Sequence, residues 1–404
     1  MGYGGNCFLG DPDSIDLWTE IIDQIPDEVF LNPDIKILNV ACGYGTESKV
    51  IVRRMRKLGF DNDYINNRIY VLDKAIWATN RMMLHGRFKN VIRADFLTWE
   101  TDMKFDIVVG NPPFKQLAKN GRQTNKSLWK EFLTLSVEIT KENGYTCLIT
   151  PTGWCSPSDN GKIIERVFSK YNLIYADISD RIKNYFNVSS TFGYTIVQKM
   201  PYQGKSEIHC NDGVHVVDLR KTKLITNKGL TIIKKLTESS DPRCDFFLAG
   251  VNHQYKGVGY HNDDKTTEAI YANIHHVNSS KDYLNDSGIP VRWSEIESPL
   301  KSKKKVVIPY NGPTKVIIDD GHYGVGWCQT MLLQADECVE YAKTVFNSNL
   351  YKFFSRVYRH TQYNETKNLN VFPKLDLTRS WSDAELYNHF NLTKEEIELI
   401  ENIC

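Results

Sequence analysis

The fold is decided by one stretch of the sequence, Ile37-Leu38-Asn39-Val40-Ala41-Cys42-Gly43-Tyr44-Gly45-Thr46. Its first residues continue a short apolar run, which predicts a buried strand over 35–40. The two glycines permit a tight turn and a close approach of the backbone to a ligand, and a helical pattern follows over 47–58. The alternative is a tight strand–helix turn that binds nothing. Ser48 stands where the dinucleotide-binding pattern has its third glycine, which argues against a nicotinamide cofactor.

Strand-like and helical segments alternate on both sides of this stretch, over residues 13–200. Further strand-like runs occur at 68–72, 90–93, 106–109, 145–149, 173–178 and 193–199. Because short buried strands that alternate with helices pair in parallel, we expect an α/β fold with a doubly wound, mainly parallel sheet, Rossmann-like in its layers.

The pattern changes after Met200-Pro201, where short β-like runs lie among loops rich in Gly, Asn, Asp and Lys. We place a domain boundary near residue 202 and expect two domains, 1–202 and 203–404, the second with a mixed α+β fold. Residues 382–403 are amphipathic and helical in pattern, and Thr393 and Glu396 have the spacing of a capping box.

The composition is that of a globular protein, with 41% hydrophobic and 25% charged residues. The formal net charge is only +1, so the whole chain offers no strong basic field to a nucleic acid. Nine cysteines without a C-x-x-C pair favour a reducing compartment, and no histidine spacing predicts a metal site. With no signal-peptide pattern and no apolar run long enough for a bilayer, we expect a cytoplasmic protein that does not use a membrane.

The sequence Asp106-Ile107-Val108-Val109-Gly110-Asn111-Pro112-Pro113-Phe114 carries the chemistry. An apolar strand is followed by the side-chain amide of Asn111. The two prolines after it stiffen the loop and remove two backbone N–H donors. The Asn111 side-chain oxygen and the Pro112 carbonyl can each accept one N–H of a ring-bound amino group. This draws the nitrogen toward tetrahedral geometry and frees its lone pair, while the Phe114 ring can stack on the base. A purely structural turn is the alternative.

Two acidic residues follow other strands of the predicted sheet. Asp73 ends the strand near 68–72, where a carboxylate can accept hydrogen bonds from ribose hydroxyls or cap the next helix. Asp95, with Phe96 beside it, follows the strand near 90–93 and fits an adenine amino group and ring, although a solvated loop acid is equally compatible.

In this order, the glycine turn, the acid, Asp-Phe and Asn-Pro-Pro-Phe resemble the adenine-N6 DNA methyltransferases. These are amino-methyltransferases with an N-terminal catalytic domain and a C-terminal target recognition domain, and many belong to type II restriction-modification systems. The resemblance covers residues 13–200 and implies the class I methyltransferase fold with S-adenosyl-L-methionine as cofactor. It implies a cofactor site formed by Asn39, Ala41, Gly43, Gly45, Asp73, Asp95 and Phe96. The catalytic loop would be Asn111, Pro112, Pro113 and Phe114.

One position departs from the pattern of this family. Asn39 stands where the glycine loop usually begins with Asp, so the charge that faces the methionine ammonium is missing there. We expect weaker cofactor binding, and an inactive copy of the enzyme is the alternative. Phe186 occupies the place of a second aromatic residue against the target base, a role for which Tyr185 and Phe192 compete.

A base in a duplex must be extruded to enter such a pocket, so double-stranded DNA is the expected partner. Basic residues of the second half are expected to contact it: Arg292, Lys303, Lys304, Arg356 and Arg359. Lys301, Lys305 and Trp293 lie beside the first three, and Tyr351, Phe353, Phe354 and Tyr358 are interleaved with the last two. A solvated face is the alternative for each cluster.

Taken together, the motifs predict site-specific methylation of a flipped-out adenine at N6, in a bacterial or phage-infected cell. No nuclease motif is present, so a separate restriction endonuclease is the expected companion. The alternatives are methylation of a protein glutamine or of an RNA amino group, and a catalytically inactive DNA-binding member of the fold.

Overall fold

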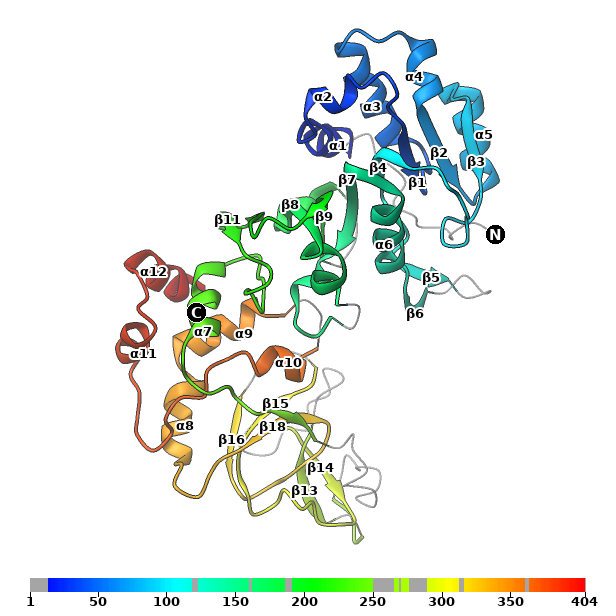
Figure 1. Ribbon diagram of the computed structural model, residues 1–404. Helices are drawn as coiled ribbons and strands as arrows, with labels where there is room; N and C mark the ends of the chain where they lie inside the picture. The colour runs from blue at the N-terminus through cyan, green and yellow to red at the C-terminus, as the bar shows by residue number, and fades with distance from the viewer. Residues whose placement is uncertain are drawn as a thin grey trace. The chain divides into compact units, whose positions relative to one another are not determined.

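The computed structural model describes residues 14–117, 123–159, 162–185, 191–249, 265–268, 270–275, 289–311, 316–359 and 363–403. The chain divides into two compact units, the first comprising Met1–Trp154 with Asp159–Lys221 and the second Cys155–Ser158 with Thr222–Cys404. The first unit therefore extends beyond the boundary predicted near residue 202, because two further strands pair with its sheet (Figure 1).

In the described part of the chain, nine strands of the first unit form one sheet, in the order β11-β10-β8-β9-β7-β4-β1-β2-β3. Their bounds are β1 Ile37–Val40, β2 Ile69–Asp73, β3 Asn90–Arg93, β4 Phe105–Gly110, β7 Thr140–Pro151, β8 Tyr171–Asp177, β9 Phe192–Pro201, β10 Ser206–Cys210 and β11 Gly213–Val217. Strands β3, β2, β1, β4 and β7 run parallel, and β9 runs antiparallel to both β7 and β8. The predicted doubly wound, mainly parallel sheet is confirmed.

Helices of the first unit are α1 Ser14–Asp23, α2 Asp27–Phe30, α3 Thr46–Lys57, α4 Asn62–Arg68, α5 Ile76–Arg81 and α6 Trp129–Ile139. The apolar face of α1 packs against α3, and both contribute to one core with the sheet, through Trp18, Ile22, Ile51 and Met55. Helix α6 packs on β4 and β7. Residues Ile164–Phe168 form a single π-helical turn before β8. The hairpin of β5 Lys115–Leu117 and β6 Gln123–Ser127, which follows the Asn-Pro-Pro-Phe loop, was not predicted.

The strand order reverses between β1 and β4, because the chain runs from β1 outward to β3 and then returns to the other side of β1. In doubly wound sheets, ligands bind beyond the carboxyl ends of the strands at this switch point. The register pairs Val40 with Gly110 and also with Leu72. The loops that follow these three strands therefore start side by side at the same level of the sheet.

An ion-pair network connects strands β8 and β9 to helix α1. The carboxylate of Asp177, fully buried at the end of β8, accepts hydrogen bonds from Arg181, which also binds Glu20 of α1. Glu20 accepts a further hydrogen bond from the Tyr194 hydroxyl at 2.7 Å. The hydrogen bonds from Arg181 lower the pKa of Glu20 despite its partial burial. The network fixes the short 3-10 helix Asp180–Tyr185 at the carboxyl edge of the sheet.

The second unit combines small sheets with helices, as the predicted α+β class requires. One sheet has the order β12-β18-β15-β16 and another the order β14-β13-β17. The strands are β12 Phe247–Leu248, β13 Tyr271–Ile274, β14 Val291–Ser294, β15 Lys304–Pro309, β16 Ile317–Asp320, β17 Gly324–Val325 and β18 Cys328–Leu332. The helices are α7 Leu230–Glu238, α8 Val339–Phe346, α9 Asn349–Val357, α10 Thr366–Leu369, α11 Asp383–His389 and α12 Lys394–Ile403.

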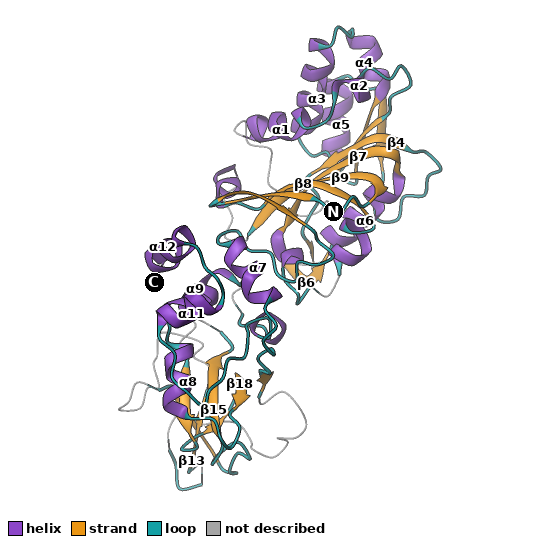
Figure 2. Cartoon of the chain, turned by 60° about the vertical axis from the view of Figure 1, so that its left-hand side comes forward, coloured by secondary structure: helices purple, strands orange, loops and turns teal. Residues whose placement is uncertain are grey.

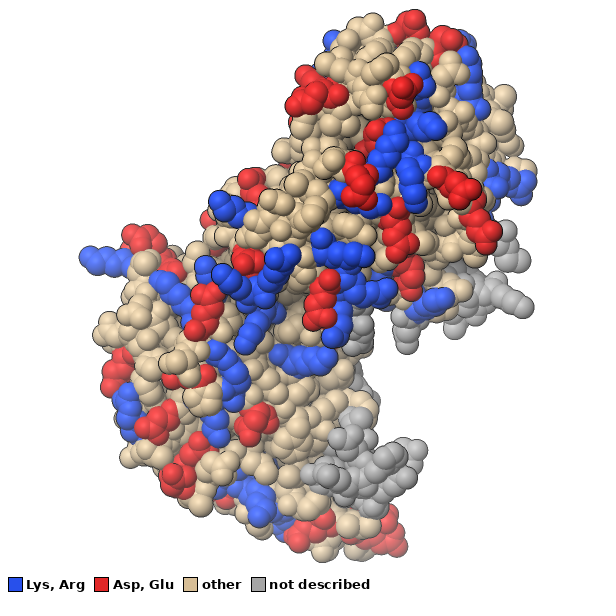
Figure 3. All heavy atoms as spheres, in the orientation of Figure 1, with Lys and Arg blue, Asp and Glu red and all other residues tan. Residues whose placement is uncertain are grey.

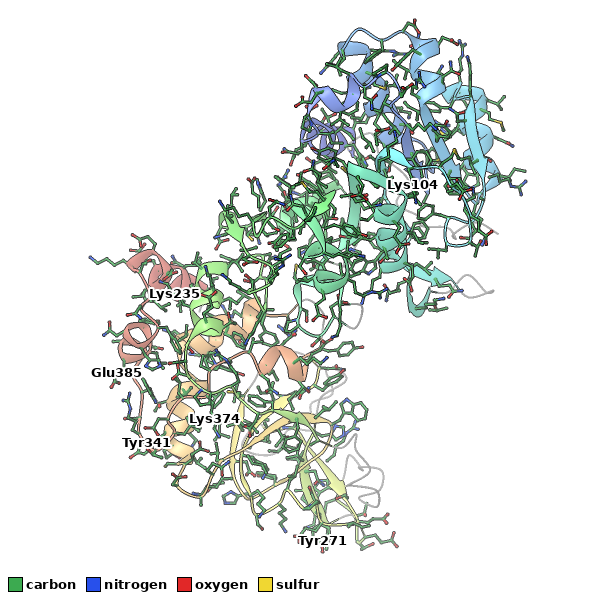
Figure 4. All side chains as sticks on the ribbon, viewed as in Figure 1. Lys104, Lys235, Tyr271, Tyr341, Lys374 and Glu385 are labelled. Atoms are coloured by element: carbon green, nitrogen blue, oxygen red, sulfur yellow. The ribbon has the colours of Figure 1, made fainter. Side chains whose placement is uncertain are left out.

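Helix α9 packs against both α11 and α12 of the C-terminal part of the chain (Figures 1 and 2). The predicted capping box is present, since the Thr393 hydroxyl accepts from the Glu396 amide and the Glu396 carboxylate from the Thr393 amide. Lys235 of α7, labelled in Figure 4, pairs with Glu396 at 2.6 Å and so attaches α12 to the unit. None of the helices in the described ranges has the length and apolar character needed to cross a bilayer.

Replacement of Gly110 by alanine should disturb the centre of the sheet. A Cβ at Gly110 would lie 2.4 Å from the backbone oxygen of Val40, so β1 and β4 would have to move apart. We expect Gly110→Ala to lower the free energy of unfolding by about 1–3 kcal/mol, measured by chemical denaturation. Gly153→Ala is the matched control, since nothing lies within 4 Å of the added carbon. Equal stability of the two variants would contradict this account of the strand pairing.

Candidate active site

The glycine turn between β1 and α3 adopts left-handed backbone conformations. Ala41, Gly43 and Gly45 have φ angles of 53°, 46° and 71°. A Cβ at Gly45 would also lie 2.6 Å from the Met82 sulfur, so the Met82 side chain would have to shift. Ala41 is the one residue of the three that incurs steric strain in this conformation. The turn curves back so that the Gly45 amide donates to the Cys42 carbonyl at 2.7 Å.

Asn39, near the end of β1, is fully buried beneath this turn. Its side-chain amide donates to the Glu47 carboxylate at 3.3 Å and to the Ser48 hydroxyl at 2.9 Å. Its Oδ1 atom is buried and has no hydrogen-bond partner. Glu47, in the first turn of α3, is buried as well, and this burial raises the pKa of its carboxyl group to about 7. The spacing of Asn39 and Glu47 in the sequence gives no sign of this contact.

Asp73 serves the fold while remaining able to bind a ligand. Its carboxylate accepts hydrogen bonds from the Gly43 amide at 3.0 Å and from the Ala75 amide at 2.7 Å. It thus fixes the glycine turn and the residue that precedes α5, the N-cap residue Ala75, at which no side chain caps the helix. Burial raises the pKa of Asp73, although these backbone hydrogen bonds act in the opposite direction. A carboxylate has lone pairs for about four hydrogen bonds, so acceptor capacity remains for hydroxyl groups.

The Asp-Phe pair after β3 is divided between surface and core. Asp95 is half-buried, pairs with Lys74 at 2.7 Å and accepts from the Leu97 amide at 3.2 Å. Phe96 is only 3% exposed, and its ring lies 5.2 Å from that of Phe132. A ring with so little exposed surface can offer a bound adenine no broad stacking face.

Two apolar side chains that the sequence analysis did not single out are exposed near Asp73. Ile76 is 52% and Trp77 45% exposed at the start of α5, and the Trp77 ring lies 5.2 Å from that of Tyr44 in the glycine turn. The available signal was the apolar pair Ile76-Trp77 that begins three residues after the acid at the strand end. These side chains form apolar surface beside the turn.

The Asn-Pro-Pro-Phe loop follows β4, and the side-chain oxygen of its first residue, Asn111, has no hydrogen-bond partner. Asn111 is half-buried, and its Oδ1 is buried without a hydrogen-bond partner. Pro112 is buried, whereas Pro113 and Phe114 are partly exposed. The Phe114 carbonyl accepts from the Leu128 amide at 3.0 Å, which anchors the end of the loop. The Phe114 ring lies 5.9 Å from that of Phe192, which is 2% exposed and supports it from the core.

The structure brings the predicted residues of the first unit to one edge of the sheet. Val40 is paired with both Leu72 and Gly110, so Ala41, Asp73 and Asn111 follow directly at neighbouring strand ends. Phe186 lies outside the described residues. Of its competitors, Phe192 is buried behind Phe114, and Tyr185 is partly buried against the same core.

The sequence of the first unit is similar to that of a known protein family. Residues 45–180 match the sequence model of a family described as Eco57I restriction-modification methylase. The first unit is therefore similar to this family over residues 45–180, and it is called the methylase domain below. The matched residues include Asp73, Asp95 and the loop 111–114, and the resemblance predicted from the motifs is confirmed. No curated protein matches the sequence.

Solved structures similar to the chain include methyltransferases and one restriction enzyme. A class I S-adenosylmethionine-dependent methyltransferase from Listeria monocytogenes shares 12% identity over 51% of this chain and 67% of its own, with a TM-score of 0.40. A type I restriction-modification methyltransferase subunit from Streptococcus thermophilus shares 15% over 53% and 56%, with a TM-score of 0.39. The type IIG restriction endonuclease BpuSI shares 12% over 100% and 61%, with a TM-score of 0.48. The chain thus spans about half to two thirds of these proteins.

The methylase domain has the class I methyltransferase fold, and its residues fit S-adenosylmethionine. The backbone at Gly43 is open, since a Cβ there would meet only the Ala41 oxygen at 3.9 Å, Asn39 Oδ1 is an unpartnered acceptor, and Asp73 has acceptor capacity for ribose hydroxyls. Ile76 and Trp77 supply the apolar surface that an adenine ring requires.

One group of potential metal ligands lies elsewhere in the described residues, although the sequence predicts no metal site. The Cys210, Asp212 and His215 side chains of the β10–β11 hairpin have their ligand atoms within 4.8 Å of one another. The His215 Nε2 atom lies 3.2 Å from the Asp212 Oδ1 atom. These strands lie at the edge of the sheet opposite β3, away from the glycine turn.

The basic residues of the second unit differ in exposure. Lys303 and Arg356 are exposed, whereas Arg292, Lys304 and Arg359 are half-buried, and the Lys304 ammonium donates to the Glu337 carbonyl at 3.2 Å. Lysines and arginines are interspersed with acidic side chains on the face drawn in Figure 3. The exposed members of this set remain available for phosphate contacts.

Two expectations about these clusters are wrong. Lys305 is fully buried and pairs with Asp319 at 2.5 Å, so it cannot reach a phosphate. The aromatic residues interleaved with Arg356 and Arg359 form the core of the second unit, because α9 turns this face toward the sheet and the other helices; they are Tyr351, Phe353, Phe354 and Tyr358. Core packing explains these aromatic rings.

Neighbouring lysines should behave differently when replaced. Lys305→Ala leaves the Asp319 carboxylate buried without its cation and should reduce the free energy of unfolding by about 3–5 kcal/mol. Lys303→Ala removes an exposed side chain and should change it by less than about 0.5 kcal/mol. Urea denaturation of the two variants checks this, and a larger loss for Lys303→Ala would contradict the assigned burial.

Proposed function

We propose that the protein is a site-specific DNA methyltransferase that transfers a methyl group from S-adenosyl-L-methionine to the N6 amino group of an adenine. The observation that carries this proposal is the Asn111 Oδ1 atom, a buried acceptor without a partner beside the glycine turn. An unsatisfied buried acceptor costs free energy in the unliganded protein, and an amino group of a substrate supplies the missing donor. The match to restriction-modification methylases supports DNA as the substrate.

The proposed chemistry resides in the loop 111–114. The nitrogen of adenine N6 is a poor nucleophile, because its lone pair is delocalised into the ring. The Asn111 side-chain oxygen and the Pro112 carbonyl each accept one of its N–H groups and favour tetrahedral geometry, so that the lone pair becomes available. S-adenosyl-L-methionine held at the glycine turn and Asp73 would supply the methyl group from its sulfonium, with the neutral thioether as the leaving group. The amino nitrogen then loses one proton to water, and no covalent enzyme intermediate is needed.

The target adenine reaches this loop only after extrusion from the duplex. The partly exposed Phe114 ring stacks on the extruded base, and Phe192 keeps that ring in position from the core. Phe186, with Phe114, is proposed as a second stacking residue. In the cofactor site, Asp73 accepts hydrogen bonds from the ribose hydroxyls. Asp95 accepts from the adenine amino group of the cofactor, and its ion pair with Lys74 must weaken to allow this contact.

The second unit is proposed as the target recognition domain, with the boundary near 202 in the sequence and at Lys221 in the structural division. Phosphate contacts are assigned to Arg292, Lys303, Lys304, Arg356 and Arg359. Double-stranded DNA is the proposed substrate. Its methylation would protect it from cleavage by a separate restriction endonuclease. Labelled cofactor offered with duplex DNA, RNA or protein tests the acceptor, and sequencing for N6-methyladenine locates the site.

Asn111→Ala removes the side-chain oxygen and should abolish methylation of duplex DNA. Binding of S-adenosylhomocysteine, measured by calorimetry, should be preserved, because residue 111 belongs to the substrate side of the site. Gln116→Ala is the matched control, since Gln116 is exposed two residues beyond Phe114. Near-normal turnover of Asn111→Ala would refute the catalytic assignment.

Phe114→Ala should slow methylation by about fivefold to 150-fold, which corresponds to the roughly 1–3 kcal/mol of a base–aromatic stack. Replacement by Tyr or Trp should retain most of the rate, because both keep a flat ring. Single-turnover kinetics on duplex DNA measures this effect. A rate for the alanine variant equal to that of the wild type would exclude stacking by Phe114.

A further inference from the structure

Two acceptor groups lie buried together beneath the glycine turn without a cation. Asn39 Oδ1 has no hydrogen-bond partner, and the amide nitrogen of the same side chain holds the Glu47 carboxylate at 3.3 Å. Glu47 is 6% exposed, and among the ion pairs of the described residues none includes it. A buried carboxylate without a cation is costly, so its retention calls for an explanation.

The surroundings of Glu47 indicate what ligand fits. Its position in the first turn of α3 favours a negative charge, yet desolvation outweighs this and raises the pKa of its carboxyl group. The other charged or titratable groups that face it are Lys49, which is exposed, and the carboxylate of Asp73 and thiol of Cys42, which add no positive charge. The missing partner is therefore a small cation that carries several N–H donors, and a primary ammonium has this chemistry.

We propose that Glu47 and Asn39 together bind the ammonium group of the amino-acid part of the cofactor, with Glu47 supplying the charge and Asn39 Oδ1 a neutral acceptor. The inference rests on the proposed function and names the residue that provides the negative charge which residue 39, an amide, lacks. The Asn39 amide donates to both Glu47 and Ser48, so that its own oxygen is oriented away from them. Glu47 is thus a binding residue. Asn39 binds the ammonium through Oδ1 and positions the Glu47 carboxylate through its amide nitrogen.

The assignment predicts how cofactor binding depends on pH. Because the pKa of Glu47 in the free protein is raised to about 7, the ionised carboxylate becomes more populated as the pH rises through that value. The ligand ammonium stays protonated below about pH 8. Affinity for S-adenosylhomocysteine should therefore increase between pH 6 and about 7.5. In Glu47→Gln this increase should disappear, and any contribution from Asp73 remains in both proteins and cancels in the comparison.

The decisive experiment compares two ligands by isothermal titration calorimetry on the full chain. S-adenosylhomocysteine carries the ammonium, whereas 5′-methylthioadenosine has the same adenine and ribose without it. Glu47→Gln should weaken binding of the first by about tenfold to a hundredfold, the range of a hydrogen bond to a charged group. Binding of the second should stay within about twofold. Glu28→Gln, at an exposed acid of the same unit, is the control for a general charge effect.

A rescue variant separates the ammonium site from a structural role. In Asn39→Asp/Glu47→Gln the acid moves by one side chain within the same cluster, and we expect most of the S-adenosylhomocysteine affinity to return. The thermal midpoint of Glu47→Gln at pH 8 should not fall, because a buried charge has been removed. Equal loss of both ligands, unchanged S-adenosylhomocysteine binding or absence of rescue would overturn the proposal.

These outcomes are distinct from failure of the proposed function. If S-adenosylhomocysteine binding depends on Glu47 but duplex DNA is not methylated, the ammonium site stands and the DNA assignment falls. If the wild-type protein binds neither ligand, both proposals fall.

Discussion

The structure of the methylase domain depends on the close parallel pairing of β1 with β4. Gly110 has no side chain, and this allows the Val40 carbonyl to approach where a Cβ would stand at 2.4 Å. The pairing sets the register at the switch point of the sheet, so that the glycine turn and the Asn-Pro-Pro-Phe loop leave adjacent strands at one level. If β4 were shifted along β1, the loop 111–114 would begin at a different level from the glycine turn. The two halves of the site would then be separated, because each consists of only a few residues.

The site carries unsatisfied hydrogen-bond acceptors in both of its halves. Asn39 Oδ1 and Asn111 Oδ1 are buried without partners, and Glu47 is a buried carboxylate without a cation. Each lowers the stability of the free domain, because a buried acceptor loses its water without gaining a donor. Cofactor and substrate groups can supply these donors, so part of the binding free energy derives from relief of these costs. The left-handed Ala41 adds backbone strain at the same place.

Charge and aromatic content in the second unit have separate structural reasons. The helix α9 has a strongly apolar face, which packs against its neighbours, and its basic residues lie on the other side. Lys303 precedes β15 and is exposed, whereas Lys304 and Lys305 are successive residues of that strand, whose side chains alternate between its two faces. This explains why adjacent basic residues divide between solvent and a buried ion pair with Asp319.

The sequence by itself located most strands of the methylase domain and the loops that bear its motifs, although not the β5–β6 hairpin. Apolar runs, glycines and prolines act on their immediate neighbours, so the residue pattern alone locates β1 to β4 and the loop 111–114. Only the tertiary structure decided the Asn39–Glu47 contact, the support of Phe114 by Phe192, the burial of Lys305 and the extension of the first unit to Lys221. These features arise from strand register and from packing between distant segments, and such contacts leave no periodic or local signal in the chain.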